Sequence, residues 1–247
     1  MTANDASSGL AWVVIPTYNE AENLEAIVAA VRDALPAEHR FLIVDDSSPD
    51  GTGEIADRMA AEGDDLEVLH RSDKEGLGPA YLAGFKHALE GGAERIVQMD
   101  ADFSHDPADV QRLLETQERT GADLVVGSRY VPGGGVVDWG PVRRFISRGG
   151  GSYAQAVLWV RVRDLTGGFK CWRRDALASI DFDLVESKGY AFQIEMTYRA
   201  IRNGFQVTEM PIHFRDRRVG DSKMSGTIVA EAIWRVPILR FRVRKAR

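Results

Sequence analysis

The sequence has little cysteine and lacks long apolar runs. Its 247 residues include one cysteine, Cys171, which excludes an intramolecular disulfide and a cysteine-based zinc cluster. We therefore expect a reducing compartment and a packing role for Cys171. No run reaches the ~18 uninterrupted apolar residues of a membrane-spanning helix. Residues 1–10 are small and polar, without the apolar core of a signal peptide, and we expect them to be disordered.

Positive charge is also scarce. The formal net charge is −6, from 31 Lys and Arg against 37 Asp and Glu, so we expect no nucleic-acid partner. The exception is the C-terminal end, where residues 235–247 carry basic side chains and no acid. We expect residues 227–247 to form an amphipathic, basic helix and tail.

Short apolar runs alternate with amphipathic segments in the first half of the chain. The sequence predicts strands at 11–15, 41–44, 66–69, 95–99 and 124–126, and helices at 21–35, 54–61, 79–89 and from Pro107 onward. This alternation is typical of a Rossmann-like, mostly parallel sheet flanked by helices. We therefore predict an α/β fold in one domain, because a chain of 247 residues is long enough to form one sizeable core.

The alternation ends after Ser128. The sequence predicts helices at 142–160, 193–203 and 227–241 and a strand at 206–214, and Pro237 is expected to kink or end the last helix. We interpret the glycine runs at 133–135 and 149–151 as flexible turns.

Asp100-Ala101-Asp102 follows the apolar run at 95–99. Two carboxylates one residue apart at a strand end can share one divalent cation, and oxygen ligands suit Mg²⁺ or Mn²⁺, which keep further sites for water and phosphate. The alternative is two solvated acids at the end of a strand. The buried strand that precedes them favours a site for a metal and a diphosphate.

Three more polar clusters follow predicted strands, at 17–20, 45–50 and 128–129. Ligands of parallel α/β sheets bind at the carboxyl ends of the strands, so we expect the four clusters to meet at one edge. Asp45 and Asp46 either cap a turn or accept hydrogen bonds from a ribose or a base, and the residues alone do not decide between these roles.

Loop cations could bind the phosphates. Arg129, Arg217 and Lys223 are candidates, because arginine forks and lysine ammonium groups match phosphate oxygens. The polar segment 215–226 is basic, as expected of a lid that closes over phosphates, or else is a solvated loop.

Two other features favour structural roles. Gly76-Leu77-Gly78 lacks the G-K-[ST] of a P-loop, so it predicts a turn into a helix. His105 lies near the carboxylates but directly precedes Asp106 and Pro107, which favours a role at the start of the next helix.

Several motifs together resemble a known family. Residues 14–20 (VIPTYNE) and 44–52 (VDDSSPDGT) resemble the opening of family 2 glycosyltransferases of the GT-A fold, and Asp100-Ala101-Asp102 is similar to the metal-binding D-x-D of that fold. Further segments resemble polyprenol- and dolichol-phosphate mannose synthases: 99–107 (MDADFSHDP), 127–130 (GSRY), 164–169 (DLTGGF) and 187–196 (SKGYAFQIEM). The resemblance runs from about Trp12 to Gly226 and implies a GT-A domain over residues 11–226.

The resemblance also implies roles for individual residues. It assigns guanosine binding to Pro16, Tyr18, Glu20, Val44 and Asp46, the metal and diphosphate to Asp100, Ala101 and Asp102, and the phosphates of donor and acceptor to Arg129, Arg217 and Lys223. Some members carry a glutamine as a further metal ligand where this sequence has Ser104. The motif therefore leaves the third protein ligand open, with water as the alternative.

The implied reaction transfers mannose from GDP-mannose to a polyprenyl monophosphate, with a divalent metal and with inversion. A lipid phosphate is already anionic at pH 7, so it needs orientation rather than a general base. The alternatives are a polyprenol-phosphate glucose synthase with a UDP-glucose donor, a glycosyltransferase with a hydroxyl acceptor, and a nucleotide-sugar-binding protein without catalysis.

A polyprenyl acceptor implies a membrane surface. The segments 142–160 and 227–241 combine arginines with large apolar side chains, a pattern suited to helices that lie in the membrane interface. The basic C-terminal end would add about 1 kcal/mol per cation near anionic lipid. The alternative is core packing with a solvated tail. Some relatives carry C-terminal transmembrane helices, and we expect instead a peripheral protein at the cytoplasmic face, with a membrane-anchoring protein as a candidate partner.

Overall fold

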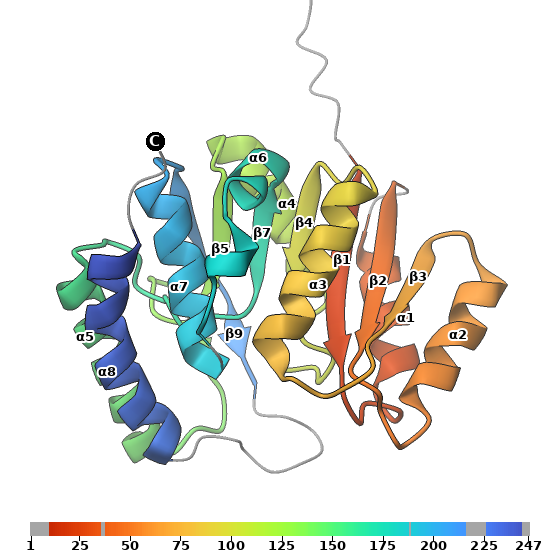
Figure 1. Ribbon diagram of the computed structural model, residues 1–247, viewed down its shortest axis with the longest axis horizontal. Coiled ribbons are helices and arrows are strands. Elements are labelled where there is room, and N and C mark those ends of the chain that lie inside the picture. The colour runs from red at the N-terminus through yellow and green to blue at the C-terminus, as the bar shows by residue number, and fades with distance from the viewer. Residues whose placement is uncertain (1–9, 36–37, 188, 216–225, 244–247) are drawn as a thin grey trace, which may run out of the picture.

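A seven-stranded sheet forms the centre of the computed structural model, which describes residues 10–35, 38–187, 189–215 and 226–243 (Figure 1). The strand order is β3-β2-β1-β4-β7-β5-β8, and β7 alone runs antiparallel to its neighbours. The strands are β1 (Ala11–Thr17), β2 (His39–Asp45), β3 (Leu66–His70), β4 (Arg95–Gln98), β5 (Leu124–Ser128), β7 (Lys170–Arg173) and β8 (Val207–Pro211). The predicted α/β architecture is thereby confirmed.

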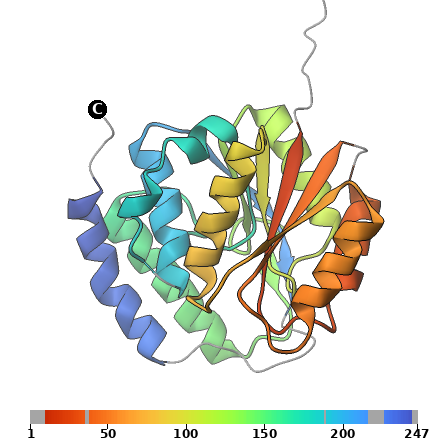
Figure 2. The same ribbon diagram turned by 45° about the vertical axis from the view of Figure 1, so that its right-hand side comes forward.

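Helices cover both faces of this sheet because successive strand residues point to opposite sides. Val13 and Ile15 of β1 face a cluster with α1, α2 and α4, whereas Trp12 and Val14 face α3, α6 and α7 (Figures 1 and 2). The helices are α1 (Leu24–Ala34), α2 (Thr52–Glu62), α3 (Leu77–Glu90), α4 (Ala108–Thr120), α6 (Arg174–Ala178) and α7 (Gly189–Arg202). A short 3₁₀ helix, η1 (Phe182–Leu184), precedes α7.

Two more helices, α5 (Pro141–Leu158) and α8 (Gly226–Arg242), lie side by side outside α7 (Figures 1 and 2). A third apolar cluster joins them to α7, through Leu158, Tyr198 and Leu239 among others. Leu239 is therefore a core residue, although it belongs to the segment 227–241, which we expected to lie in the membrane interface. Within the described ranges, no helix has both the length and the apolar character needed to cross a membrane.

Some local expectations were wrong. The glycines at 149–151 lie inside α5 rather than in a turn. Pro237 does not end α8, which continues to Arg242; the alternative prediction, a kink, stays a prediction. The predicted strand at 206–214 is divided into β8 and β9 (His213–Phe214), and β9 pairs with β6 (Gly135–Val136), the end of the other glycine run.

Cys171 has the predicted packing role. It is fully buried in β7, and burial raises the pKa of its thiol to about 12. A thiol that stays protonated at neutral pH is a poor nucleophile.

Candidate active site

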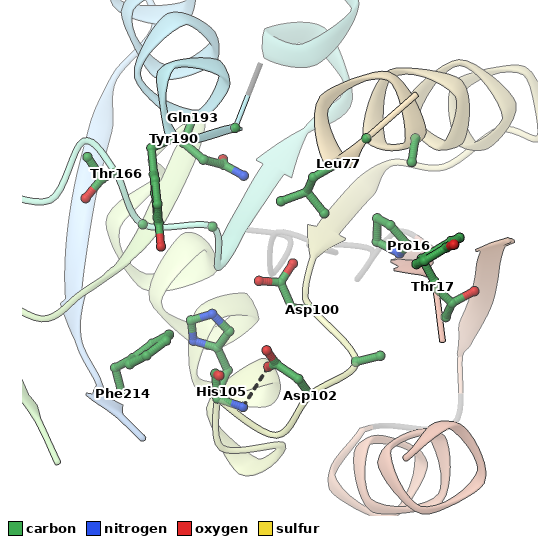
Figure 3. A pocket seen from close by; sticks show the side chains of 18 of the residues that line it. Pro16, Thr17, Leu77, Asp100, Asp102, His105, Thr166, Tyr190, Gln193 and Phe214 are labelled. Atoms are coloured by element: carbon green, nitrogen blue, oxygen red, sulfur yellow. Dashed lines mark hydrogen bonds between the residues drawn. The ribbon is translucent and has the colours of Figure 1, made fainter. Parts of the chain in front are cut away.

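A cavity of about 660 Å³ lies at the carboxyl ends of β1, β2, β4 and β5 (Figure 3). This volume is typical of small-molecule sites. The four polar clusters that follow these strands meet there, as the strand-end rule predicts. The predicted residues that line the cavity are Pro16, Tyr18, Glu20, Asp46, Asp100, Ala101, Asp102, Ser104 and Arg129.

Three residues in the loops that line the cavity have a left-handed backbone conformation. Asn19, Ser47 and Phe103 have φ angles of 59°, 57° and 57°, and each directly follows a residue that lines the cavity. Such a conformation costs a bulky side chain about 1–2 kcal/mol. Phe103 adopts this conformation immediately after Asp102, and strained backbone of this kind is concentrated at functional sites.

The adjacent acids after β2 have different roles. Asp45 holds the turn, since its Oδ1 accepts hydrogen bonds from Ser48 Oγ at 2.6 Å and Thr17 Oγ1 at 3.1 Å. Asp46 lines the cavity instead, and the Arg71 guanidinium forms an ion pair with it. Burial raises the pKa of Asp46, an effect that Arg71 opposes. The structure thus separates the capping acid from the candidate ligand-binding acid.

Three predicted donor-binding residues are not in the described wall of the cavity. The Val44 side chain is fully buried between the sheet and α3, where a Cβ on Gly84 would come within 2.9 Å of Val44 Cγ2. Any contact of Val44 with a nucleotide would have to use its backbone. Arg217 and Lys223 lie outside the described residues.

The two carboxylates after β4 are held by different neighbours. Asp100 Oδ1 accepts a hydrogen bond from Tyr81 Oη at 2.8 Å, and Asp102 Oδ1 accepts one from the Ser104 backbone N–H at 3.0 Å. Ser104 Oγ is buried in the cavity wall without a hydrogen-bond partner among the described residues. Carboxylate and hydroxyl oxygens are hard ligands of the kind that Mg²⁺ and Mn²⁺ prefer.

Water and the substrate could supply the other ligands of such a cation. In the part of the chain that the structure describes, no group of three or more His, Cys, Asp or Glu residues could hold a metal ion. Mg²⁺ and Mn²⁺ sites commonly combine one or two carboxylates with water and substrate phosphates. The arrangement therefore suits a cation that binds together with a diphosphate.

Arg129 lies in the cavity wall but is already paired. Its Nε and Nη2 donate to Asp164 Oδ2 and Oδ1, each at 2.7 Å, and its backbone N–H donates to Asp164 Oδ2 at 2.9 Å. Burial favours the neutral acid, but Arg129 outweighs burial and lowers the pKa of Asp164. The rings of Tyr130, Trp139 and Phe214 surround the guanidinium at 5.3–5.7 Å. Arg129 therefore braces the wall, a role that the motif does not reveal.

His105 lines the cavity, contrary to the role we expected for it. Its ring stacks on Phe169, with centroids 4.7 Å apart, and burial lowers the pKa of His105 to about 4. The expected role at the start of α4 belongs to Asp106, whose Oδ1 accepts the Ala108 N–H at 3.0 Å.

Sequence reasoning also missed several lining residues. Lys74 places its ammonium 3.4 Å from the centre of the Tyr18 ring, and its loop gave no sequence signal. Thr166, Gly167, Gly168, Tyr190 and Gln193 belong to segments that carry the family resemblance, which could have indicated them. The remaining lining residues that were missed include Trp139, Arg143 and Phe214.

Comparison with known proteins assigns the family. The model of glycosyl transferase family 2 matches residues 12–181, which include the D-x-D carboxylates and both strand-end loops before them. The chain belongs to this family. It is therefore a glycosyltransferase, as the motifs predicted.

Two relatives of this glycosyltransferase are 51% identical to it. One is the polyprenol monophosphomannose synthase of Mycolicibacterium smegmatis, aligned over 91% of this chain and 84% of the relative. The other is the undecaprenyl-phosphate mannosyltransferase of Micrococcus luteus, aligned over 89% of each chain. They confirm the resemblance to polyprenol-phosphate mannose synthases.

Solved structures support the GT-A fold of this glycosyltransferase. Glucosyl-3-phosphoglycerate synthase from Mycobacterium tuberculosis, in complex with Mn²⁺, UDP and glucosyl-3-phosphoglycerate, superposes with a TM-score of 0.70. The match covers 98% of this chain and 82% of that protein, at 19% sequence identity. At this identity the likeness concerns the fold alone.

Proposed function

We propose that this glycosyltransferase transfers mannose from GDP-mannose to the phosphate of a polyprenyl monophosphate, with Mg²⁺ or Mn²⁺ and with inversion at the anomeric carbon. The observation that carries the proposal is the 51% identity to two relatives, over about nine-tenths of the chain. One relative is named a polyprenol monophosphomannose synthase and the other an undecaprenyl-phosphate mannosyltransferase. The D-x-D carboxylates in the cavity are consistent with a diphosphate donor.

The nucleoside half of the donor fits the end of the cavity below β1 and β2. Pro16, Tyr18 and Asp46 line that end, and Arg71 holds the Asp46 carboxylate in place. A fixed carboxylate can accept hydrogen bonds from a base N–H or a ribose hydroxyl. Lys74, stacked on Tyr18, adds a cation near the expected phosphates.

The transfer step needs no proton removal. An anionic oxygen of the acceptor phosphate attacks C1 of mannose as the bond from C1 to the diphosphate oxygen breaks, and GDP leaves with the electron pair. Asp100 and Asp102 would hold the cation, which supplies charge stabilisation to the departing diphosphate. The remaining work of the protein is to orient two anions and to exclude water, and the buried wall of the cavity suits both tasks.

A donor panel tests this proposal. Purified protein would be incubated with polyprenyl monophosphate, Mg²⁺ or Mn²⁺, and radiolabelled GDP-mannose, GDP-glucose, UDP-glucose or UDP-mannose. We expect transfer to the lipid with GDP-mannose at a rate well above the others, and a β-linked product. Preference for UDP-glucose would replace the proposal with a glucose synthase, and donor binding without transfer would indicate a non-catalytic sensor.

Tyr81 provides a test of the carboxylate site. Tyr81→Phe removes the hydroxyl that orients Asp100 but keeps the ring packed against Phe85 and Phe192. We expect the apparent affinity for the divalent cation to fall about tenfold, as is usual when a partner of a metal ligand is lost. Titration of activity against Mg²⁺ and Mn²⁺ measures this. Tyr198→Phe, at a buried tyrosine in the third cluster, is the matched control and should leave the titration unchanged. If both variants showed the same dependence of activity on metal concentration, the Tyr81 hydroxyl would have no role in cation binding.

We also propose that α5 and α8 place the protein on the cytoplasmic face of the membrane, next to its lipid acceptor. Both helices expose large apolar side chains at helical spacing: Val142, Phe145 and Ile146 on α5, and Trp234, Ile238 and Phe241 on α8. Trp159, just after α5, is 82% exposed beneath the Arg240 guanidinium. Exposed apolar side chains flanked by arginines are typical of helices that lie in an anionic interface.

The first turn of α5 connects this surface with the cavity. Arg143 lines the cavity and stacks on Trp139, 4.1 Å from its ring centre, while neighbouring Val142 is 70% exposed. A lipid whose tail lies against α5 could therefore reach the cavity with its phosphate.

Loss of the exposed apolar side chains should weaken membrane binding. In the variant Phe145→Ser, Trp159→Ser, Trp234→Ser, we expect binding to anionic vesicles to fall about tenfold or more, because each large side chain contributes up to about 1.5–3 kcal/mol when it leaves water. Co-sedimentation measures the binding. Transfer to a short, water-soluble prenyl phosphate should stay within about twofold of the wild type. Unchanged co-sedimentation would contradict the proposed surface.

A further inference from the structure

The side-chain amide of Gln193, in α7, has a hydrogen-bonded oxygen and a nitrogen without a hydrogen-bond partner among the described residues. Its side chain is 2% exposed and lines the cavity. Its Oε1 accepts hydrogen bonds from Gln98 Nε2 and Lys170 Nζ, each at 2.8 Å. Its Nε2 is buried and has no hydrogen-bond partner among the described residues. A buried donor without a partner is costly, so its retention indicates a use.

The two donors on Oε1 fix the orientation of the amide. An amide oxygen accepts and an amide nitrogen donates, so the end that receives two N–H groups must be the oxygen. Lys170 Nζ also donates to the Gln193 carbonyl oxygen at 3.0 Å. Burial lowers the pKa of Lys170 to about 7, but both the ammonium and the neutral amine carry the two N–H groups that these bonds need. The NH₂ end of Gln193 is therefore directed away from this network.

Gly168 shows where the NH₂ group lies. A Cβ on Gly168 would be 3.4 Å from Gln193 Nε2 and 3.7 Å from Asp100 Oδ2, so the amide and the carboxylate flank the same small space. The absence of a side chain at Gly168 keeps that space open. In Figure 3, Gln193 and Asp100 project into the cavity from opposite sides.

We propose that the Gln193 NH₂ group donates a hydrogen bond to a hydroxyl oxygen of the hexose that the donor carries, beside Asp100. This inference rests on the proposed function, in which Asp100 belongs to the metal and diphosphate end of the donor site. A hydroxyl both accepts and donates, so it matches a neutral amide donor next to a carboxylate acceptor. Phosphate oxygens are more commonly matched by Arg or Lys forks and ammonium groups.

Such a contact would give Gln193 a role in donor specificity. Sites built to hydrogen-bond a substrate hydroxyl discriminate against analogues without it, because the buried polar group is then left unpaired. The hexose hydroxyl in question is defined by experiment, by removing the hydroxyls one at a time.

Two variants test the contact by binding rather than by turnover. Gln193→Glu keeps an oxygen for Gln98 and Lys170 but lacks the NH₂ donor, and Gln193→Met lacks the donor without adding charge. We expect the affinity for GDP-mannose, measured by calorimetry with Mg²⁺, to fall about 3- to 10-fold in both variants, the range of one lost hydrogen bond. The affinity for GDP should change by less than about twofold, because GDP lacks the hexose.

A matched control separates this effect from damage to the core. Gln117 is another buried glutamine, on α4 at the opposite face of the sheet, where its Nε2 donates to the Cys171 carbonyl oxygen at 3.3 Å. Gln117→Met should lower the thermal unfolding temperature without changing the ratio of the GDP-mannose and GDP affinities. Cooperative unfolding of both Gln193 variants shows that they are folded.

GDP-sugars that each lack one hydroxyl of mannose complete the test. In the wild type we expect one of them to bind less tightly, and in the Gln193 variants we expect that penalty to vanish, as for any directly coupled pair. The inference is overturned if every penalty persists in the variants, if GDP and GDP-mannose lose affinity equally, or if only the KM of the lipid acceptor changes. If the wild type shows no preference for GDP-mannose, the proposed function itself fails, which the donor panel reports separately.

Discussion

Replacement of Asp102 by alanine is expected to lower the rate of mannosyl transfer by about 10³-fold, which corresponds to the several kcal/mol that a positioned divalent cation contributes to a departing diphosphate. Asp102 is 5% exposed and lies beside Asp100 in the cavity wall. Its loss removes one of the two carboxylates of the D-x-D pair. Single-turnover rates at saturating GDP-mannose, over a range of Mg²⁺ and Mn²⁺ concentrations, measure the effect.

The same substitution should leave the stability of the metal-free protein unchanged or raise it. A buried carboxylate beside another one is unfavourable without a cation, and functional sites are often less stable than their inactive variants. We therefore expect Asp102→Ala to unfold at the same temperature as the metal-free wild type or at a higher one.

Asp106→Ala is the matched control, because Asp106 is an exposed acid in the same loop, and its side chain accepts the Ala108 N–H at the start of α4. It should lower stability slightly and leave transfer within about twofold, since loss of a cap typically costs about 1 kcal/mol. If Asp102→Ala retained the wild-type rate and metal dependence, the carboxylate pair would have no role in the reaction.

The sequence predicts the part of this site that depends on strand ends. Apolar runs show where β1, β2, β4 and β5 lie, and the parallel order places their carboxyl ends at one edge. Polar residues directly after those runs, such as Tyr18 and Asp102, could therefore be assigned to the cavity before the structure was known. Their short distance from a strand end leaves few other positions for them.

The rest of the site depends on pairs that are distant in the sequence. Lys170 breaks the apolar pattern of β7, so this strand was missed, and its buried amino group is hydrogen-bonded to Gln193 on another element. The ion pair of Asp46 and Arg71 likewise joins residues that are distant in the sequence. The glycines inside α5 are helical in a helix that packs against the distant α8. Local propensity cannot predict such contacts, because tertiary packing overrides it.

The Arg129–Asp164 pair is expected to have the largest effect on stability. Both side chains are at least nine-tenths buried, and three hydrogen bonds join the two residues. Asp164→Ala leaves the guanidinium buried without its counter-charge, which typically costs about 3–5 kcal/mol. For a chain of this size, that loss lowers the unfolding temperature by roughly 6–20 °C. Glu25→Ala, which removes an exposed ion pair with Arg58, should cost at most about 1 kcal/mol.

The pH dependence separates the charge of Asp164 from its shape. Because Arg129 lowers the folded-state pKa of Asp164 below its ordinary 3.8, the pair stabilises the protein fully above that value and is lost as the pH falls through the folded-state pKa. Asp164→Asn should therefore be less stable than the wild type by a constant amount from about pH 5 to pH 8, and the difference should shrink in more acidic solution. The double variant Arg129→Met, Asp164→Leu should recover much of the loss, since apolar replacement of a whole buried pair is often neutral. If the double variant is as unstable as the sum of the single ones, the wall of the cavity depends on each side chain separately and not on their pairing.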